Sequence, residues 1–204
     1  MKQLLSCIFI SAAFILLGSN FGQAEALDLG SKIPLAAIRM KNVDGKELSI
    51  DNIAGPKGTL IIFSCNHCPY VKAWQSRMVA LANSYQKRGV GVLFINSDDP
   101  DANPEDSFTI MQERAKVNGY QFPYTVDAGS AVARAFGATH TPEVFLFDNG
   151  GRLVYHGAVD DDRDQKMVTK QYLRNALEAL VEGKPIPVAE TKAIGCGLNL
   201  YPKF

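Results

Sequence analysis

The hydrophobic positions of this chain alternate between short continuous runs and segments with helical periodicity. Thr59–Phe63 and Gly91–Asn96 are apolar runs of strand length, which is typical of strands buried on both faces. Between Pro69 and Gly89, apolar side chains recur at every third or fourth position, and this spacing predicts an amphipathic helix that begins at the proline. Strands alternating with such helices predict an α/β fold, with a central mixed β-sheet and helices on both faces.

The remaining segments extend this pattern at both ends. Ala37–Ile50 predicts an N-terminal β-hairpin around Asp44-Gly45, and Asn149-Gly150-Gly151 predicts a second hairpin turn. No linker or internal repeat interrupts the sequence, so we expect one domain over residues 27–204. The other expected elements are helices at Phe108–Gly119, Ser130–Phe136 and about Gln165–Glu182, and strands at Glu143–Phe147 and Arg152–Gly157.

Residues 1–26 have the pattern of a secretory signal peptide. Lys2 is the only charge before Glu25, and an apolar run follows it from Leu4 to Gly18. Small residues then offer a cleavage site near Ala24 or Ala26. The apolar run is shorter than the roughly 18 to 20 residues that cross a bilayer. We therefore expect an exported protein, periplasmic or secreted, with an uncleaved membrane anchor as the alternative.

Composition and charge narrow the classes of function. The chain has 204 residues, and 21 basic residues balance 21 acidic ones, so it has no electrostatic reason to bind nucleic acid or an anionic membrane surface. Of the four cysteines, Cys7 lies in the signal segment and is expected to leave with it. Cys65, Cys68 and Cys196 remain in the exported chain. A domain of this size needs no disulfide to fold, so we expect these cysteines to do chemistry.

The segment Cys65-Asn66-His67-Cys68 lies between a predicted buried strand and a predicted helix. This spacing allows a small disulfide, and the helix N-terminus favours an anionic sulfur at Cys65. We expect Cys65 to be the exposed attacking thiol, Cys68 to be the more buried resolving thiol, and His67 and Asn66 to tune them. The function predicted is thiol–disulfide exchange, which needs no cofactor. Only Cys196 and scattered histidines could complete a zinc site, so no metal is expected.

Thr141-Pro142 precedes a predicted strand, and its proline is a candidate cis residue. A strand, a CxxC, a helix and a late Thr-Pro together resemble the thioredoxin fold. The resemblance implies that the cis-proline loop lies against the CxxC. It also implies that the backbone of Thr141, with Pro142, forms the platform for the extended chain of a substrate.

Five ordered blocks narrow the resemblance to a thioredoxin-like branch of the redoxin superfamily, which holds the alkyl hydroperoxide reductase/thiol-specific antioxidant proteins. The blocks are FSCNHCPYVKAW, PEDSF, FPYTVD, TPEVFLFD and AIGCGLNLYP. Members usually carry cysteine before the Thr-Pro, where this chain has His140, a further imidazole that could tune Cys65. The resemblance implies a disulfide or dithiol substrate and a redox partner that resets the CxxC.

Two alternatives remain open. A thiol-dependent peroxidase belongs to the same superfamily, but its members place Thr or Ser three residues before the cysteine, where this chain has Ile62. A copper-binding redoxin or metallochaperone is the other, because soft thiolates suit Cu(I).

Cys196, flanked by glycines near the C-terminus, is a candidate extra redox thiol that could reach the CxxC or pair with a second copy. We expect the acidic segments Asp98–Asp106 and Asp160–Asp162 to be solvated loops.

Overall fold

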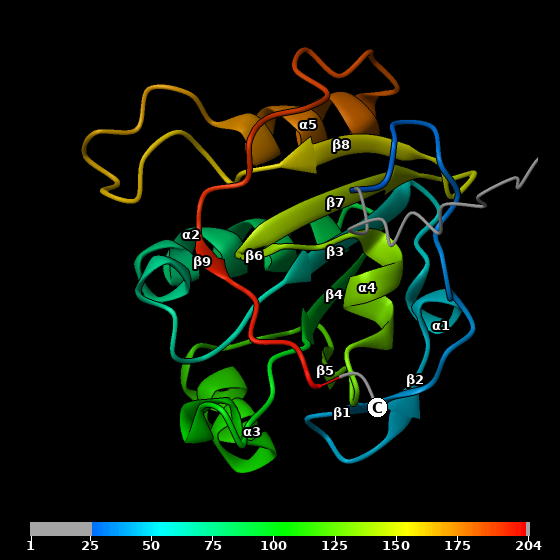
Figure 1. Cartoon of the computed structure of the whole chain (residues 1–204). Coiled ribbons are helices and arrows are strands. Elements are labelled where there is room, and N and C mark those ends of the chain that lie inside the picture. The colour runs from blue at the N-terminus through cyan, green and yellow to red at the C-terminus, as the bar shows by residue number, and fades with distance from the viewer. Residues whose placement is uncertain (1–25, 203–204) are drawn as a thin grey trace, which may run out of the picture.

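The computed structural model of the chain describes residues 26–202. Almost all of the predicted signal peptide, including Cys7, lies outside these residues. Within them, no helix combines the length and the apolar character that crossing a membrane requires. The predicted N-terminal hairpin, the central sheet and the late hairpin are all present (Figure 1).

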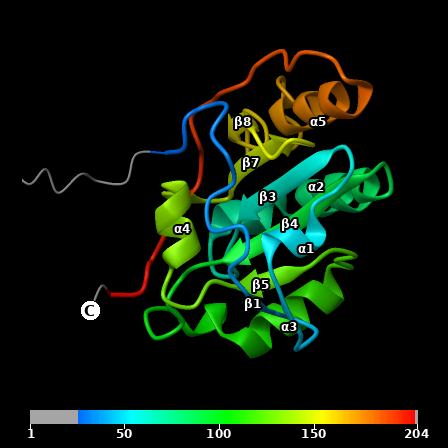
Figure 2. The ribbon, with the colours of Figure 1, turned by 90° about the vertical axis from the view of Figure 1, so that its right-hand side faces the viewer.

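The sheet is mixed and consists of two groups of strands. In one group the order is β2-β1-β5-β4, with β4 parallel to β5 and the other pairs antiparallel. In the other the order is β3-β7-β8, all antiparallel. β3 lies beside β4, and the Ser64 N–H donates to the Ile95 carbonyl at 2.8 Å (Figure 2). The strands are β1 Met40–Asn42, β2 Glu47–Leu48, β3 Gly58–Phe63, β4 Val90–Asn96, β5 Tyr124–Val126, β7 Glu143–Asp148 and β8 Leu153–Gly157.

Helices cover both faces of the sheet, as the sequence predicts. Alternate residues of each central strand point to opposite faces. Leu60 and Ile62 of β3 face the core under α2, α3 and α5, whereas Ile61 and Phe63 face the core under α1 and α4. Trp74 is fully buried in the first core. The helices are α1 Ile50–Ile53, α2 Pro69–Gln86, α3 Phe108–Val117, α4 Ala131–Phe136 and α5 Tyr172–Glu182, with a short 3-10 helix, η1 Pro104–Asp106.

The last helix begins later than the sequence predicts, at Tyr172 instead of about Gln165. Side-chain oxygens hold the preceding segment in turns. Asp161 accepts from the backbone N–H of Thr169 at 3.0 Å and of Lys170 at 2.9 Å. Such local bonds compete with helical ones, because they satisfy the same backbone donors in another conformation. Asp160 in this segment is buried and paired with Arg77 at 2.6 Å, so the expectation of a solvated loop is wrong for this residue.

The C-terminal segment returns to the central part of the molecule after α5. It forms a two-residue strand, β9 Cys196–Gly197, which pairs antiparallel with β6 His140–Thr141. Thr141 is directly opposite Cys196 in this register. The segment then runs on past Asp98, which forms a bridge with Leu200 (Figure 1). The glycine-flanked cysteine is thus fixed beside the Thr-Pro loop.

Candidate active site

Cys65 follows β3 by two residues and is buried, with 1% of its surface exposed. The expectation of an exposed attacking thiol is therefore wrong for this state of the protein. Its Sγ lies 3.1 Å from the hydroxyl oxygen of Thr141. Burial raises the pKa of the Cys65 thiol to about 12, because an anionic sulfur loses its hydration there. The Thr141 hydroxyl and the Cys68 N–H oppose this shift without cancelling it.

Two buried carboxylates also disfavour a thiolate at Cys65. Asp106 and Asp98 both raise its pKa through their negative charge. Asp98 follows β4 by two residues, and Asp106 ends η1. Both residues are almost fully buried, so the expectation that Asp98–Asp106 is a solvated loop is wrong at its two ends. Burial is also the largest cause of the raised pKa of Asp98.

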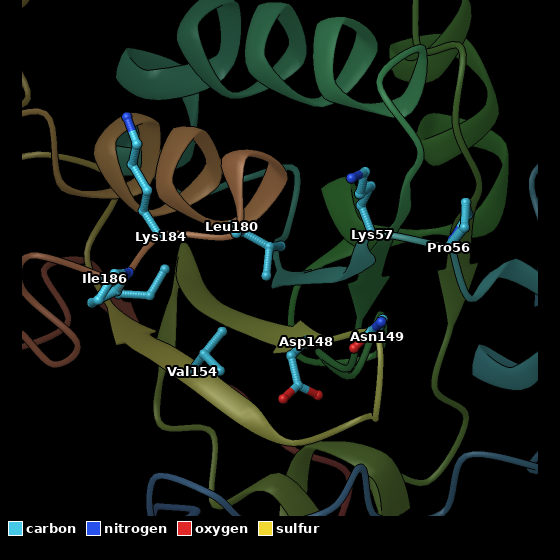
Figure 3. Close-up of a pocket in the computed structure, with 10 residues that line it drawn as sticks. Pro56, Lys57, Asp148, Asn149, Val154, Leu180, Lys184 and Ile186 are labelled. Carbon is cyan, nitrogen blue, oxygen red and sulfur yellow. The ribbon is translucent and has the colours of Figure 1, made fainter.

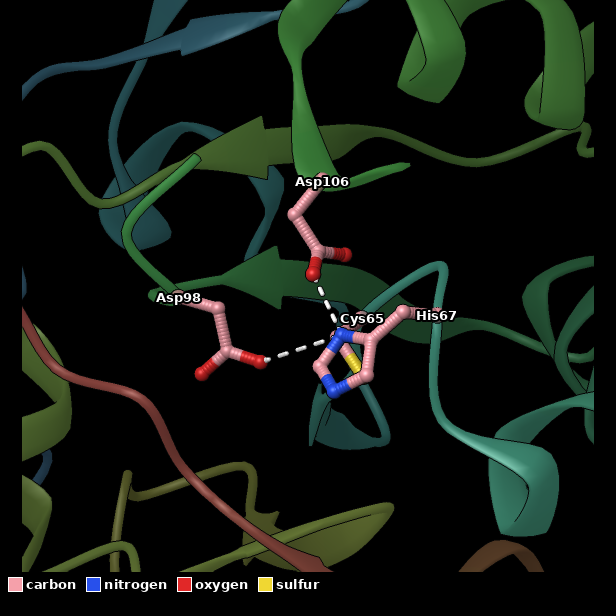
Figure 4. A group of neighbouring side chains, drawn as sticks. All are labelled: Cys65, His67, Asp98 and Asp106. Carbon is pink, nitrogen blue, oxygen red and sulfur yellow. Dashed lines mark hydrogen bonds and ion pairs between the residues drawn. The ribbon is translucent and has the colours of Figure 1, made fainter. Parts of the chain in front are cut away.

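Placement after strands is the sequence signal that could have found Asp98. Cys65 and Asp98 each follow a buried strand by two residues, and those strands lie side by side. No comparable sequence signal marks Asp106, because only the folding of the loop after Asp98 brings its carboxylate close to Cys65. Together with the imidazole between the two cysteines, these residues form a group, called the Cys65 cluster below (Figure 4). The cluster consists of Cys65, His67, Asp98 and Asp106.

His67 faces the carboxylates. Its Nδ1 lies 2.5 Å from Oδ2 of Asp106 and 3.9 Å from Oδ2 of Asp98 (Figure 4). Asn66 instead fixes the CxxC loop through two hydrogen bonds. Its backbone N–H donates to Oδ1 of Asp106 at 2.5 Å, and its side-chain oxygen accepts from the hydroxyl of Tyr124 at 3.1 Å. The residues between the two cysteines thus tie the CxxC loop to the acidic loop.

Cys68 is bonded to Cys196, with the two Cα atoms 6.1 Å apart. The expected Cys65–Cys68 disulfide is therefore absent from this state, and Cys65 is the free thiol among the cysteines of residues 26–202. Of the two possibilities for Cys196, the structure has the one in which the tail reaches the CxxC. Gly195 is needed for this approach, because a Cβ there would lie 2.3 Å from the carbonyl oxygen of Thr141.

The Thr141-Pro142 bond is cis, as the sequence predicts. Thr141 contacts both sulfurs of the CxxC: its hydroxyl meets Cys65, and its carbonyl oxygen lies 3.2 Å from Sγ of Cys68. The implied juxtaposition of the proline loop and the CxxC is thus confirmed. His140 is half-buried, its Nδ1 contacts the hydroxyl of Thr139 at 2.8 Å, and within residues 26–202 no hydrogen bond joins its ring to Cys65.

Glu143, which the sequence did not single out, holds the Thr-Pro loop. Its carboxylate accepts from the backbone N–H of Thr139 at 2.7 Å and of His140 at 2.9 Å. The other oxygen lies 2.7 Å from Nε2 of His156. Because Glu143 is 1% exposed, these bonds replace the water that a buried carboxylate loses.

A surface pocket lies away from these residues, between the end of α5 and the turn after β7 (Figure 3). Lys57, Asp148, Leu180 and Lys184 are among its lining residues. Its lining contains no thiol or imidazole, so it cannot perform the sulfur chemistry that the CxxC offers.

Comparison with known proteins identifies the family. A model of the AhpC/TSA family matches residues 29–156. The chain belongs to the AhpC/TSA family. The match includes the whole Cys65 cluster and the Thr-Pro loop, and it ends before the Cys196 segment.

Individual relatives agree with this assignment. The crystal structure of an uncharacterized conserved protein from Geobacillus kaustophilus is 39% identical, with a TM-score of 0.81, and the match covers 87% of this chain and 94% of that one. A thioredoxin-like protein in the oxidized form matches 78% of this chain and 99% of its own at 20% identity and a TM-score of 0.63, which shows the thioredoxin-like fold. The thiol-disulfide oxidoreductase ResA of Bacillus cereus is 21% identical over 164 residues, 80% of this chain and 87% of ResA.

Proposed function

We propose that this protein is an exported thiol–disulfide oxidoreductase in which Cys65 attacks the substrate and a Cys68–Cys196 disulfide stores the oxidising equivalents. The observation that carries this proposal is a disulfide at one cysteine of the CxxC beside a free thiol at the other. The similarity to ResA supports the reaction class. Export rests on the signal pattern of residues 1–26.

The exchange begins from the fully reduced protein. The Cys65 thiol loses its proton, and its sulfur attacks one sulfur of a substrate disulfide. A mixed disulfide forms, and the other substrate sulfur leaves as a thiolate that takes up a proton. The Cys68 sulfur then attacks Cys65 and releases the second substrate sulfur as a thiol.

Cys196 completes the sequence. Its thiolate attacks Cys68, a Cys68–Cys196 disulfide forms, and Cys65 leaves as a free thiol. Two electrons have passed from two protein thiols to the substrate disulfide, and the two protons lost by the protein balance the two gained by the substrate. The product is the state seen in the structure. A dithiol partner must then reduce the Cys68–Cys196 disulfide.

The edge of β6 is the site we propose for the substrate chain. Thr141 pairs there with Cys196, so the tail of this protein occupies the position that an extended substrate takes in the thioredoxin fold. We propose that release of β9 frees the backbone of Thr141 and opens access to Cys65. Reduction of the Cys68–Cys196 disulfide removes the bond that holds β9 in place.

The surroundings of Cys65 favour the direction of a reductase. An oxidising CxxC is one whose reduced form is stabilised as a thiolate. Here burial and two carboxylates raise the pKa of Cys65, and His67 is directed at Asp106. The anionic sulfur that the sequence predicts at Cys65 therefore has no support in this geometry.

The two alternatives find less support. A peroxidase needs a reactive thiolate, which the carboxylates beside Cys65 oppose. A Cu(I) site needs several soft ligands, but the disulfide removes Cys68 and Cys196 as thiolates. Thiol–disulfide exchange uses all three cysteines in the positions where the structure has them.

Single-turnover reduction of a chromogenic aromatic disulfide by the fully reduced protein tests the proposal. Every variant carries Cys7→Ser, and this background alone is the control. We expect the control to reduce one disulfide per chain, Cys65→Ser to fall to the rate of buffer, and Cys68→Ser to accumulate a mixed disulfide on Cys65. Retention of the control rate by Cys65→Ser would show that another sulfur attacks.

A further inference from the structure

The Cys65 cluster brings together the side chains that bind transition metals. One thiol, one imidazole and two carboxylates each offer a ligand atom, and these four atoms all lie within 4.8 Å of one another. They come from three separate places in the sequence: the CxxC loop, the end of β4 and the end of η1. The fold thus assembles the set, and no local motif does.

An unsatisfied carboxylate oxygen points to a missing ligand. Asp98 is 2% exposed, and its Oδ2 is buried without a hydrogen-bond partner. Its other oxygen accepts from the backbone N–H of Asn199 at 2.7 Å, which fixes the carboxylate. Oδ2 is directed toward Nδ1 of His67 inside the cluster (Figure 4). A buried carboxyl oxygen without a partner is costly, and a cation bound inside the cluster would satisfy it.

We propose that the Cys65 cluster binds a divalent transition-metal cation of the zinc class. The donor set of one sulfur, one nitrogen and two oxygens suits Zn²⁺, which accepts all three ligand types in four-coordinate sites. It suits Cu(I) poorly, because two of the four ligands are hard carboxylate oxygens. Zinc was set aside on the sequence alone because only Cys196 and scattered histidines were counted as further ligands, and the two carboxylates were not placed beside Cys65.

Charge favours a divalent ion over an empty cluster. On binding, the Cys65 thiol gives its proton to solvent, a metal–sulfur bond forms, and the hydrated ion loses water. The ionised thiol and the two carboxylates then carry three negative charges, of which the ion neutralises two. Binding must therefore release at least one proton and strengthen as pH rises.

This site and the proposed exchange reaction share Cys65 but need different partners. The disulfide occupies Cys68 and Cys196, so the oxidised protein keeps its cluster sulfur free for a metal. A bound ion would occupy the nucleophile, so metal binding and disulfide exchange would compete for one sulfur. The exchange reaction makes no bond to Asp98, and removal of this negative charge should speed the attack by Cys65, whereas the metal site needs the carboxylate as a ligand.

The test uses the oxidised full-length protein in the Cys7→Ser background. Zn²⁺ affinity is measured by competition with a chromophoric chelator, and Co²⁺ is used as the spectroscopic probe. We expect one ion per chain and a thiolate-to-Co²⁺ charge-transfer band that disappears in Cys65→Ser. Asp98→Asn should weaken Zn²⁺ binding by more than about tenfold. Asp101→Asn, an exposed carboxylate of the same loop, is the matched control and should leave the affinity unchanged.

Circular dichroism establishes that each variant is folded, and the single-turnover assay is run on the same variants after full reduction. An absence of one-to-one Zn²⁺ binding would overturn the proposal, and so would equal affinities in the control, Cys65→Ser and Asp98→Asn. Failure of the exchange reaction with normal Zn²⁺ binding would instead count against the proposed function alone. Loss of metal binding in Asp98→Asn with retained exchange is the pattern that supports both.

Discussion

The two cysteines of one motif have opposite surroundings. Cys65 is next to two carboxylates and a hydroxyl, and it is a free thiol. Cys68 is bonded to a tail that lies 128 residues away in the sequence. Both are buried, so exposure does not separate their roles. Their roles differ because Cys65 lies against Asp98 and Asp106, whereas Cys68 is bonded to Cys196. These contacts depend on the tertiary fold and not on the CxxC spacing.

Replacement of Cys196, the disulfide partner of Cys68, is the change with the largest expected effect. Cys196→Ser deletes a cross-link over 128 residues, and a loop of this length contributes about 5 kcal/mol in the chain-entropy account. We expect the oxidised variant to unfold at a clearly lower urea concentration than the oxidised parent protein. The parent protein, once reduced, should fall to the same midpoint. Identical midpoints for the oxidised proteins would mean that the Cys68–Cys196 bond does not form.

Replacement of Asp98, a carboxylate next to Cys65, is expected to have an intermediate effect on the reactivity of that thiol. With a pKa raised to about 12, Cys65 should react with an alkylating agent about tenfold faster for each pH unit between about pH 7 and about pH 10, with no plateau. Asp98→Asn removes a negative charge, so the thiolate becomes less unfavourable and the pKa falls. We expect alkylation of chelator-treated, oxidised protein to be several-fold faster at pH 8.

Asp101→Asn serves again as the control for this measurement, because it removes an equal charge from an exposed position of the same loop. A plateau below pH 9 in the parent protein would contradict the raised pKa. An unchanged rate in Asp98→Asn would remove that carboxylate from the explanation.

His140 is expected to give the smallest effect. Its half-buried ring contacts only the Thr139 hydroxyl at 2.8 Å among its hydrogen-bond partners, and it does not belong to the Cys65 cluster. His140→Ala should change the single-turnover rate by less than about twofold, since changes at positions without buried contacts usually have small effects. A tenfold loss would show that this imidazole tunes Cys65 after all. Glu143→Gln, which alters the buried carboxylate under the same loop, should cost more than His140→Ala.

The sequence was sufficient for the parts of the fold that depend on local pattern. Buried strands, the helix that begins at Pro69, both hairpins and the cis Thr141-Pro142 bond follow from periodicity, turn residues and resemblance. The start of α5 was misplaced because aspartate side chains satisfy the backbone donors before Tyr172. The hydrophobic periodicity of the sequence carries no information about these side-chain hydrogen bonds.

The site was predictable only in its cysteines and its Thr-Pro loop. Charge runs such as Asp98–Asp106 are usually solvated. The position after a buried strand marks Asp98, but nothing local marks Asp106 as buried. The pairing of Cys68 with Cys196 depends on a β6–β9 contact between segments more than 50 residues apart, which one sequence cannot reveal. Cys65 was expected to be exposed because the CxxC was considered without the Thr-Pro loop and the acidic residues that lie against it.

Disulfide mapping after one turnover tests the central claim most directly. The fully reduced parent protein is mixed with one equivalent of substrate disulfide, quenched with a thiol-trapping reagent, digested and analysed by mass spectrometry. The account predicts that Cys68 and Cys196 are found in one linked pair of peptides and that Cys65 carries the trapping label. A final state with Cys65 linked to Cys68 and the label on Cys196 would contradict it.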